Sequence, residues 1–394
     1  MPSRNLMVMQ SGGCTAVINR SLAGIIRAAR KILPESRIYG ANHGMEGLIS
    51  GKIPDLTEIS DQQMNFLDIL PAAALGSTRH KLLHNDIEPI FNIFDRHNIG
   101  ILHIIGGNDS AETGMALSQT AIDLGYALKV VNVPKTIDND LTETDHSPGY
   151  GSTARFVAQA TFGAGLDAAS MGDSAPITLI EVMGRDAGWL PAAASMYKNS
   201  AYDPPHFVGI PEIIFDENLF LIQIEEAYRK HGYAVGVLSE NIRSSDGPVG
   251  KNKSPWFIDD FGHAYYESPI RHLAEQVSKR LGVRCRYEKP GTIQRSLMDS
   301  ISSTDSREAH LVGMKAVEAA HSGETEKIIS LVRKDTHSYT CDTELAPLGK
   351  VAGAVRTLPS NFAPDIAGNI SNEFKTYLEP LIGQNFYPPN SPLI

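Results

Sequence analysis

The sequence predicts an α/β fold with mainly parallel sheets. Short apolar runs typical of buried strands alternate with segments of helical period through most of the chain. Three of these runs end in turns that combine glycine with polar residues, and ligands of open α/β sheets bind beyond the carboxyl ends of strands. At 394 residues the chain is long enough for two such domains, each with its own core.

The first unit has the order strand, glycine turn, helix. Residues 6–9 are the expected strand, Gly12 and Gly13 lie in the turn, and apolar residues recur at helical spacing over residues 17–29. Two glycines let a backbone approach an anion at a helix N-terminus, but the same pattern fits an ordinary turn, which we favour for this motif alone. No P-loop lysine follows, which excludes a Walker-type nucleotidase.

The second unit repeats this order. Residues 101–105 form the expected strand, and Gly107, Asn108 and Asp109 lead from it into a helix over residues 111–124. Asp109 could cap this helix without binding a ligand.

The third strand, residues 128–133, runs into the polar segment 134–140, which carries Lys135, Asp138 and Asp140. Such residues are also common in plain turns. Because parallel strands with right-handed crossovers end at one edge of a sheet, we expect the three turns to meet there.

The second half of the chain predicts another α/β unit. Residues 177–182 and 234–239 are expected strands, residues 244–260 a surface loop or flap, and residues 270–281 and 309–320 helices. The segment 149–154 fits the pattern G-x-G-x-x-A, but no strand precedes it. A dinucleotide site is therefore rejected in favour of a helix over about residues 152–162.

Composition excludes several classes of protein. The net charge is −10 and no basic run occurs, which argues against nucleic-acid binding. No apolar run could span a bilayer or act as a signal peptide. The three scattered cysteines predict neither disulfides nor a zinc site, and we expect a reduced, cytoplasmic setting. His80 and His84, spaced i and i+4, are interpreted as surface or structural residues rather than metal ligands.

Seven short motifs together resemble the phosphofructokinase family over roughly residues 5–300. They are Ser11-Gly12-Gly13, Gly76-Ser77-Thr78-Arg79, Gly106-Gly107-Asn108-Asp109-Ser110, residues 134–140, Met183-Gly184-Arg185, Ser239-Glu240, and Gln294-Arg295 with Arg286 before it. The resemblance implies phosphoryl transfer to the 1-hydroxyl of fructose 6-phosphate with Mg²⁺ as cofactor. It also implies a homodimer or homotetramer, because Arg286 resembles an arginine that relatives lend to a neighbouring subunit.

The resemblance also assigns roles residue by residue. Asp138 resembles the general base, and Lys135 and Asp109 complete the catalytic set. The donor-binding residues implied are Gly12, Gly13, Arg79, Gly107, Asn108, Asp109 and Lys135. The substrate-binding residues implied are Thr136, Asp138, Met183, Gly184, Arg185, Glu240, Arg286, Thr292 and Arg295. The metal ligands implied are Asn108 and Asp140.

Asp109 and Lys135 resemble the pyrophosphate-dependent branch, since members that use ATP generally have glycine at both positions. A carboxylate at Asp109 would face the α-phosphate of a nucleotide. Like charges about 4 Å apart at a dielectric near 20 repel by roughly 4 kcal/mol, on the order of a thousandfold in binding. Three positions depart from the family pattern: Asn108 replaces an acidic metal ligand, Thr292 replaces a histidine or tyrosine beside the 6-phosphate, and Pro176 replaces an arginine that many relatives contribute from the adjacent subunit.

We therefore expect two Rossmann-like domains with the active site in the cleft between them. Residues 1–148 would bind the donor, completed by about residues 297–335. Residues 149–296 would bind the sugar phosphate, completed by part of residues 336–394. The alternatives are an ATP-dependent 6-phosphofructokinase, a kinase of another sugar phosphate such as sedoheptulose 7-phosphate, and a non-catalytic phosphosugar-binding subunit.

Overall fold

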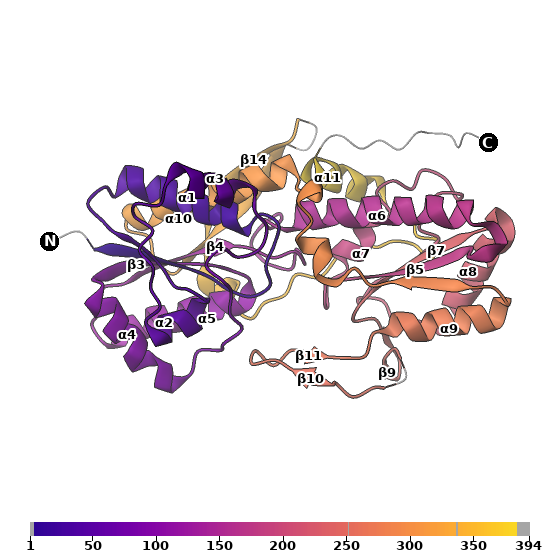
Figure 1. The fold of residues 1–394 in the computed structure, drawn as a ribbon, viewed down its shortest axis with the longest axis horizontal. Coiled ribbons are helices and arrows are strands. Elements are labelled where there is room, and N and C mark those ends of the chain that lie inside the picture. Colours follow the sequence, from indigo (N-terminus) through magenta and orange to yellow (C-terminus); the bar gives the residue numbers. More distant parts are fainter. Residues whose placement is uncertain (1–3, 251, 336–337, 384–394) are drawn as a thin grey trace. The chain divides into compact units, whose positions relative to one another are not determined.

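The structure, a computed structural model, describes residues 4–250, 252–335 and 338–383. It divides into two compact units (Figure 1). Unit 1 comprises Met1–Tyr150, Asp259–His263 and Arg295–Arg356, and unit 2 comprises Gly151–Ile258, Ala264–Gln294 and Thr357–Ile394. The expected loop 244–260 and the expected completing segment 336–394 each include residues outside the described ranges, namely 251, 336–337 and 384–394.

Unit 1 is built on a six-stranded sheet in the order β14-β13-β4-β3-β1-β2. Its strands are β1 (Asn5–Gln10), β2 (Ile38–Gly40), β3 (Ile99–Gly106), β4 (Lys129–Pro134), β13 (Lys327–Asp335) and β14 (Thr340–Pro347). All neighbouring pairs are parallel except β13 with β14. The prediction of a mainly parallel sheet is confirmed.

Helices cover both faces of this sheet because alternate residues of its strands are apolar on each side. Leu6 and Val8 of β1 face one core, and Met7 and Met9 face the other. The helices of unit 1 are α1 (Ile18–Ile32), α2 (Gly44–Ser50), α3 (Asp61–Ile69), α4 (Ile87–Arg96), α5 (Asn108–Asp123) and α10 (Ser303–His321). Short 3-10 turns lie at His84–Asp86, Met298–Ser300 and Leu348–Lys350.

Helices α1 and α10 lie side by side on one face although they are far apart in sequence (Figure 1). Glycines allow the close approach. A Cβ atom on Gly24 would lie 2.2 Å from the carbonyl oxygen of His310, and one on Gly313 would lie 2.1 Å from that of Ser21. Both distances are far below van der Waals contact, so any side chain at either glycine would push the helices apart.

Unit 2 is built on a four-stranded, fully parallel sheet in the order β12-β5-β7-β6. Its strands are β5 (Ile177–Val182), β6 (Phe207–Gly209), β7 (Ala234–Ser239) and β12 (Cys285–Glu288). Its helices are α6 (Tyr150–Ser170), α7 (Trp189–Ala193), α8 (Glu217–His231), α9 (Pro269–Leu281) and α11 (Asn372–Ile382), with 3-10 turns at Gly172–Ser174 and Gly291–Arg295.

Several local predictions differ from the structure. The expected loop over residues 244–260 contains most of two short hairpins, β8 (Arg243–Ser244) with β9 (Gly247–Pro248) and β10 (Phe257–Ile258) with β11 (Ala264–Tyr265). Strands of two residues are too short to give a periodic signal. Helix α6 begins at Tyr150 and extends beyond the predicted segment to Ser170.

The structure supports the structural interpretation of His80, whose Nε2 lies 2.8 Å from a carboxylate oxygen of Asp86. His84 opens the 3-10 turn His84–Asp86, so the two histidines do not share a helical face. Within the described ranges, no helix combines the length and apolar character needed to cross a membrane.

Candidate functional site

The ends of three neighbouring strands bring the predicted donor residues together in unit 1. Gln10 of β1 is paired with Ile105 of β3, and Gly106 of β3 is paired with Pro134 of β4. The backbone N–H of Lys135 donates to the carbonyl oxygen of Gly106 at 3.1 Å. The three polar turns therefore share one edge of the sheet, as the sequence predicted.

Gly12 and Gly13 make room for two cationic side chains. A Cβ atom on Gly12 would lie 3.2 Å from Nζ of Lys135, and one on Gly13 would lie 2.4 Å from Nη1 of Arg295. Gly12 also has a φ of 76°, which disfavours other residues. Helix α1 begins only at Ile18, so these glycines lie in a turn before the helix, which fits the ordinary turn favoured from the sequence. They admit an ammonium and a guanidinium group.

Lys135, at the strand ends of the sheet in unit 1, has a strongly lowered pKa. Its side chain is buried, and burial lowers the pKa of the ammonium group from 10.5 to about 8, with a further lowering by the positive charge of Arg295. Cys14, Asp138 and Asp140 act in the opposite direction. A bound anion would favour the charged form, so Lys135 is suited to a site for a polyanion.

Asn108 and Asp109 form the first turn of α5, and Gly107 is its N-cap residue. The side-chain oxygen of Asn108 accepts a hydrogen bond of 3.0 Å from the backbone N–H of Asp109. This bond occupies part of the capacity of an oxygen expected to bind a metal. Asp109 does not cap the helix through its side chain, since no side-chain cap is formed at Gly107. Its carboxylate remains partly exposed.

Two residues that sequence reasoning missed contact the donor-binding set within unit 1. A carboxylate oxygen of Asp259 lies 2.6 Å from Nη1 of Arg79. Nε2 of His263 lies 3.5 Å from a carboxylate oxygen of Asp109. Both residues come from the segment Asp259–His263, far from Arg79 and Asp109 in sequence, so no local motif could reveal them.

The segment after β4 is held in one conformation by its own polar groups. The backbone N–H of Asp138 donates to Oγ1 of Thr136 at 3.1 Å. Asn139 is fully buried with a φ of 55°, and its side-chain oxygen accepts from the N–H of Ser147 at 3.1 Å. Asp138 and Asp140 flank it and are half-buried.

Arg356, the last residue of unit 1, forms hydrogen bonds with the segment after β4. Its guanidinium donates to the carbonyl oxygens of Asn139, Thr144 and Asp145 at 2.8, 2.6 and 2.7 Å. These bonds satisfy carbonyl groups that lie outside helices and strands. Arg356 is a third residue that the sequence did not single out.

The carboxylates at this edge fit a metal ion held mainly by phosphate and water. In the described part of the chain, three or more potential metal-ligating side chains come together only at His146, Glu308 and Cys341. Asp109, Asp138 and Asp140 thus form no preformed protein cage. A divalent ion such as Mg²⁺ is commonly bound by one or two carboxylates together with substrate phosphates, so these residues need not form a complete cage by themselves to hold one.

Unit 2 brings the predicted sugar-binding residues together at the ends of β5 and β7. The N–H of Met183 donates to Oε1 of Gln294 at 3.2 Å, and the N–H of Arg185 donates to Oε1 of Glu240 at 3.4 Å. Gly184 and Arg185 have φ values of 132° and 49°, which turn the chain sharply there. Burial raises the pKa of Glu240, and the charge of Glu181 raises it further.

Arg286 and Thr292 lie on β12 and in the turn Gly291–Arg295. The guanidinium of Arg286 contacts the carboxylate of Asp167 and donates to Oγ1 of Thr178 at 3.4 Å. It is therefore engaged within its own chain. Thr292 is exposed, and Arg295, which ends the same turn, belongs to unit 1 beside Gly13.

Comparison with known proteins agrees with this geometry. The family described as Phosphofructokinase matches residues 5–320. The pyrophosphate–fructose 6-phosphate 1-phosphotransferase of Halomonas elongata is 36% identical over 396 residues, covering 99% of this chain and 94% of that protein. The protein of the same name from Rhodospirillum rubrum is 37% identical, with coverages of 96% and 94%. The crystal structure of a pyrophosphate-dependent phosphofructokinase from Marinobacter aquaeolei has a TM-score of 0.88 at 33% identity, covering 99% of this chain and 94% of that one. The chain therefore belongs to the phosphofructokinase family.

Proposed function

We propose that this protein transfers a phosphoryl group from pyrophosphate to the 1-hydroxyl of fructose 6-phosphate. The products are fructose 1,6-bisphosphate and phosphate, and the reaction is reversible. The observation that carries the proposal is the buried ammonium group of Lys135, which Gly12 admits at the strand ends. The relatives named for the same reaction support it across nearly the full length of the chain.

Lys135 supplies positive charge that a pyrophosphate donor requires. Pyrophosphate has no nucleoside to bind, so charge on the protein must provide its affinity and must stabilise the charge that develops during transfer. Lys135 is desolvated, which strengthens its interaction with a phosphate oxygen. Arg79 and the backbone at Gly107 complete the proposed donor-binding set.

Asp138 is the proposed general base. The bond between the bridging oxygen and the transferred phosphorus breaks, and a bond forms between that phosphorus and the 1-oxygen of the sugar. The proton of the 1-hydroxyl passes to the carboxylate of Asp138, and the electron pair of the broken bond leaves with phosphate. Thr136 orients the backbone at Asp138 through the hydrogen bond of 3.1 Å and would contact the reacting groups.

The residues of unit 2 are proposed to bind the sugar phosphate. Glu240 accepts hydrogen bonds from sugar hydroxyls, and the turn at Met183, Gly184 and Arg185 contacts the ring. The 6-phosphate is bound by Arg295 with Thr292 nearby and by Arg286. Because Arg286 contacts Asp167 in its own chain, it must exchange this partner to serve a neighbouring subunit of a homodimer or homotetramer.

Mg²⁺ is the proposed cofactor, with Asp140 and Asn108 as its protein ligands. When bound, it neutralises charge on the phosphate oxygens. Asp140 offers the hard carboxylate oxygen that this ion prefers, and Asn108 offers a neutral one. We propose a cytoplasmic setting, because three scattered cysteines predict no disulfide framework.

A coupled assay of fructose 1,6-bisphosphate formation with each donor tests the proposal. We expect turnover with pyrophosphate and little with ATP. Turnover with ATP alone would make the protein an ATP-dependent kinase, and preference for sedoheptulose 7-phosphate would reassign the acceptor. Binding of fructose 6-phosphate without turnover by either donor would favour a non-catalytic subunit.

Asp109 provides the sharper test of donor choice. Asp109→Gly should raise kcat/KM for ATP by up to about a thousandfold, because it removes both the charge and the bulk that oppose an α-phosphate. Asp109→Asn removes only the charge and should give a smaller gain. If neither variant uses ATP better than the wild type, Asp109 does not select the donor.

A further inference from the structure

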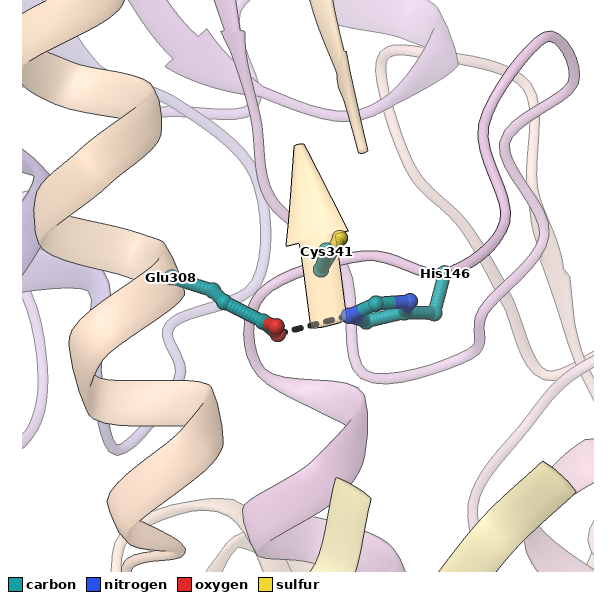
Figure 2. A group of neighbouring side chains, drawn as sticks. All are labelled: His146, Glu308 and Cys341. Atoms are coloured by element: carbon teal, nitrogen blue, oxygen red, sulfur yellow. Dashed lines mark hydrogen bonds and ion pairs between the residues drawn. The ribbon is translucent and has the colours of Figure 1, made fainter. Parts of the chain in front are cut away.

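A second group of potential ligands lies in unit 1, away from the strand-end turns. His146, Glu308 and Cys341 converge from three elements: the segment after β4, helix α10 and strand β14 (Figure 2). One ring nitrogen of His146, one carboxylate oxygen of Glu308 and the sulfur of Cys341 all lie within 4.8 Å of one another. His146 and Glu308 are buried, and Cys341 is half-buried.

The neighbours of these side chains orient them as the outer shell of a metal site does. Nδ1 of His146 lies 2.8 Å from a carboxylate oxygen of Asp145, which Arg333 in turn contacts at 3.1 Å. This leaves Nε2 directed at Glu308. The hydroxyl of Tyr339 donates to the second carboxylate oxygen of Glu308 at 2.6 Å. When one ring nitrogen of a histidine binds a metal, a carboxylate commonly accepts a hydrogen bond from the other nitrogen and fixes the orientation of the ring.

We propose that His146 Nε2, the Glu308 carboxylate and Cys341 Sγ bind a divalent ion of the zinc class, with a water molecule in the fourth position. Nitrogen, oxygen and sulfur ligands together suit a borderline ion such as Zn²⁺, in tetrahedral geometry. They do not suit Mg²⁺, which prefers oxygen. The site is thus chemically distinct from the magnesium site proposed at Asp140.

The charges of the ligands offset those of the ion. The Glu308 carboxylate and the Cys341 thiolate together carry two negative charges, which match the two positive charges of a divalent ion in a buried place.

Binding of the ion requires the thiol of Cys341 to lose its proton to solvent and Nε2 of His146 to present its lone pair. The hydrogen bond between His146 and Glu308, 2.6 Å long without metal, is replaced by two metal bonds. His146 belongs to the segment that begins with Lys135, so an ion here would tie that segment to α10 and β14.

The test uses the full chain, stripped of metal by a chelator and then titrated with Co²⁺ and with Zn²⁺. We expect one Co²⁺ bound per chain with the charge-transfer absorption of a thiolate ligand, its displacement by Zn²⁺, and release of protons in calorimetry with different buffers. Cys341→Ser should abolish this absorption and weaken Zn²⁺ binding by at least tenfold. Cys285→Ser, a matched change at a cysteine of unit 2, should alter neither.

Absence of the absorption in the wild type, or its persistence in Cys341→Ser, would overturn the proposal and leave a buried ion-pair network only. A measurement on the wild type covers the case in which Cys341→Ser does not fold. Zn²⁺ should slow alkylation of Cys341 by iodoacetamide at least tenfold, as located by mass spectrometry, without slowing alkylation of Cys14. Equal rates with and without Zn²⁺ would also overturn it.

Discussion

Replacing Lys135 by methionine should stabilise the fold while lowering activity. The ammonium group of Lys135 is almost entirely buried, with 4% of the residue exposed. Methionine has a similar length and no charge to desolvate. Loss of a charged hydrogen-bond partner of the donor should lower kcat/KM for pyrophosphate by roughly 10-fold to 100-fold or more.

The pKa of Lys135 sets the size of the gain in stability. At about 1.4 kcal/mol per tenfold change in proton affinity, lowering the pKa from 10.5 to about 8 corresponds to about 3 kcal/mol. The folded-state pKa lies below the unfolded one, so the unfolded chain binds more protons between these values. The charged lysine therefore destabilises the fold fully below pH about 8, and the penalty vanishes as pH rises past about 10.5.

Urea unfolding of the wild type and of Lys135→Met at pH 7 and pH 10 measures this effect. The variant should gain about 3 kcal/mol at pH 7 and less than about 1 kcal/mol at pH 10. Lys129→Met is the control: this lysine of β4 donates from Nζ to the carbonyl oxygen of Ala320 at 2.8 Å, and its replacement should not stabilise the fold. Equal gains for Lys135→Met at both pH values, or destabilisation at pH 7, would refute the reasoning.

Three further outcomes follow from the same geometry. Asp138→Asn should lower kcat by about 10²-fold to 10⁴-fold with little change in KM, as steady-state kinetics would show; an unchanged kcat would exclude it as the base. The value of kcat/KM for pyrophosphate should decline above pH about 8, because Lys135 loses its proton there. Lys135→Arg should move this decline to higher pH, since a guanidinium group stays protonated. A decline that this change does not alter would belong to another group. Arg356→Lys should lower the free energy of unfolding by about 2 kcal/mol and should also lower kcat. The reason is that an ammonium group cannot reach three carbonyl oxygens in different directions. An unchanged kcat would show that Arg356 does not hold Asp138 in place.

Continuous apolar strands were the features most readily predicted from the sequence. The bounds of β5 and β7 were predicted correctly, because each is a short apolar run that ends at a turn. The meeting of Gly12, Gly107 and Lys135 followed from the geometry of parallel strands. The resemblance to the phosphofructokinase family, which the family match and the relatives confirm, rested on the same turns.

Features that depend on residues far apart in sequence could not be predicted. Strand β13 begins and ends with charged residues and gives no clear period, yet it pairs with β4. The contact of Asp259 with Arg79 joins two segments without any shared motif. The three scattered cysteines predicted no zinc site, because sequence motifs for metal sites depend on the spacing of ligands along the chain. His146, Glu308 and Cys341 are far apart in sequence and are brought together only by folding.

The position of β13 in the sheet of unit 1 has a consequence for how the protein is made. Strand β4 receives its second neighbour only from residues 327–335, and α10 reaches its place against α1 only from residues 303–321. While the ribosome is still adding the intervening segments, β4 presents an open row of backbone hydrogen-bonding groups, and one apolar face of the sheet is partly bare. Such an edge invites association between nascent chains. The sheet of unit 1 can therefore be completed only after residues 303–335 have been synthesised.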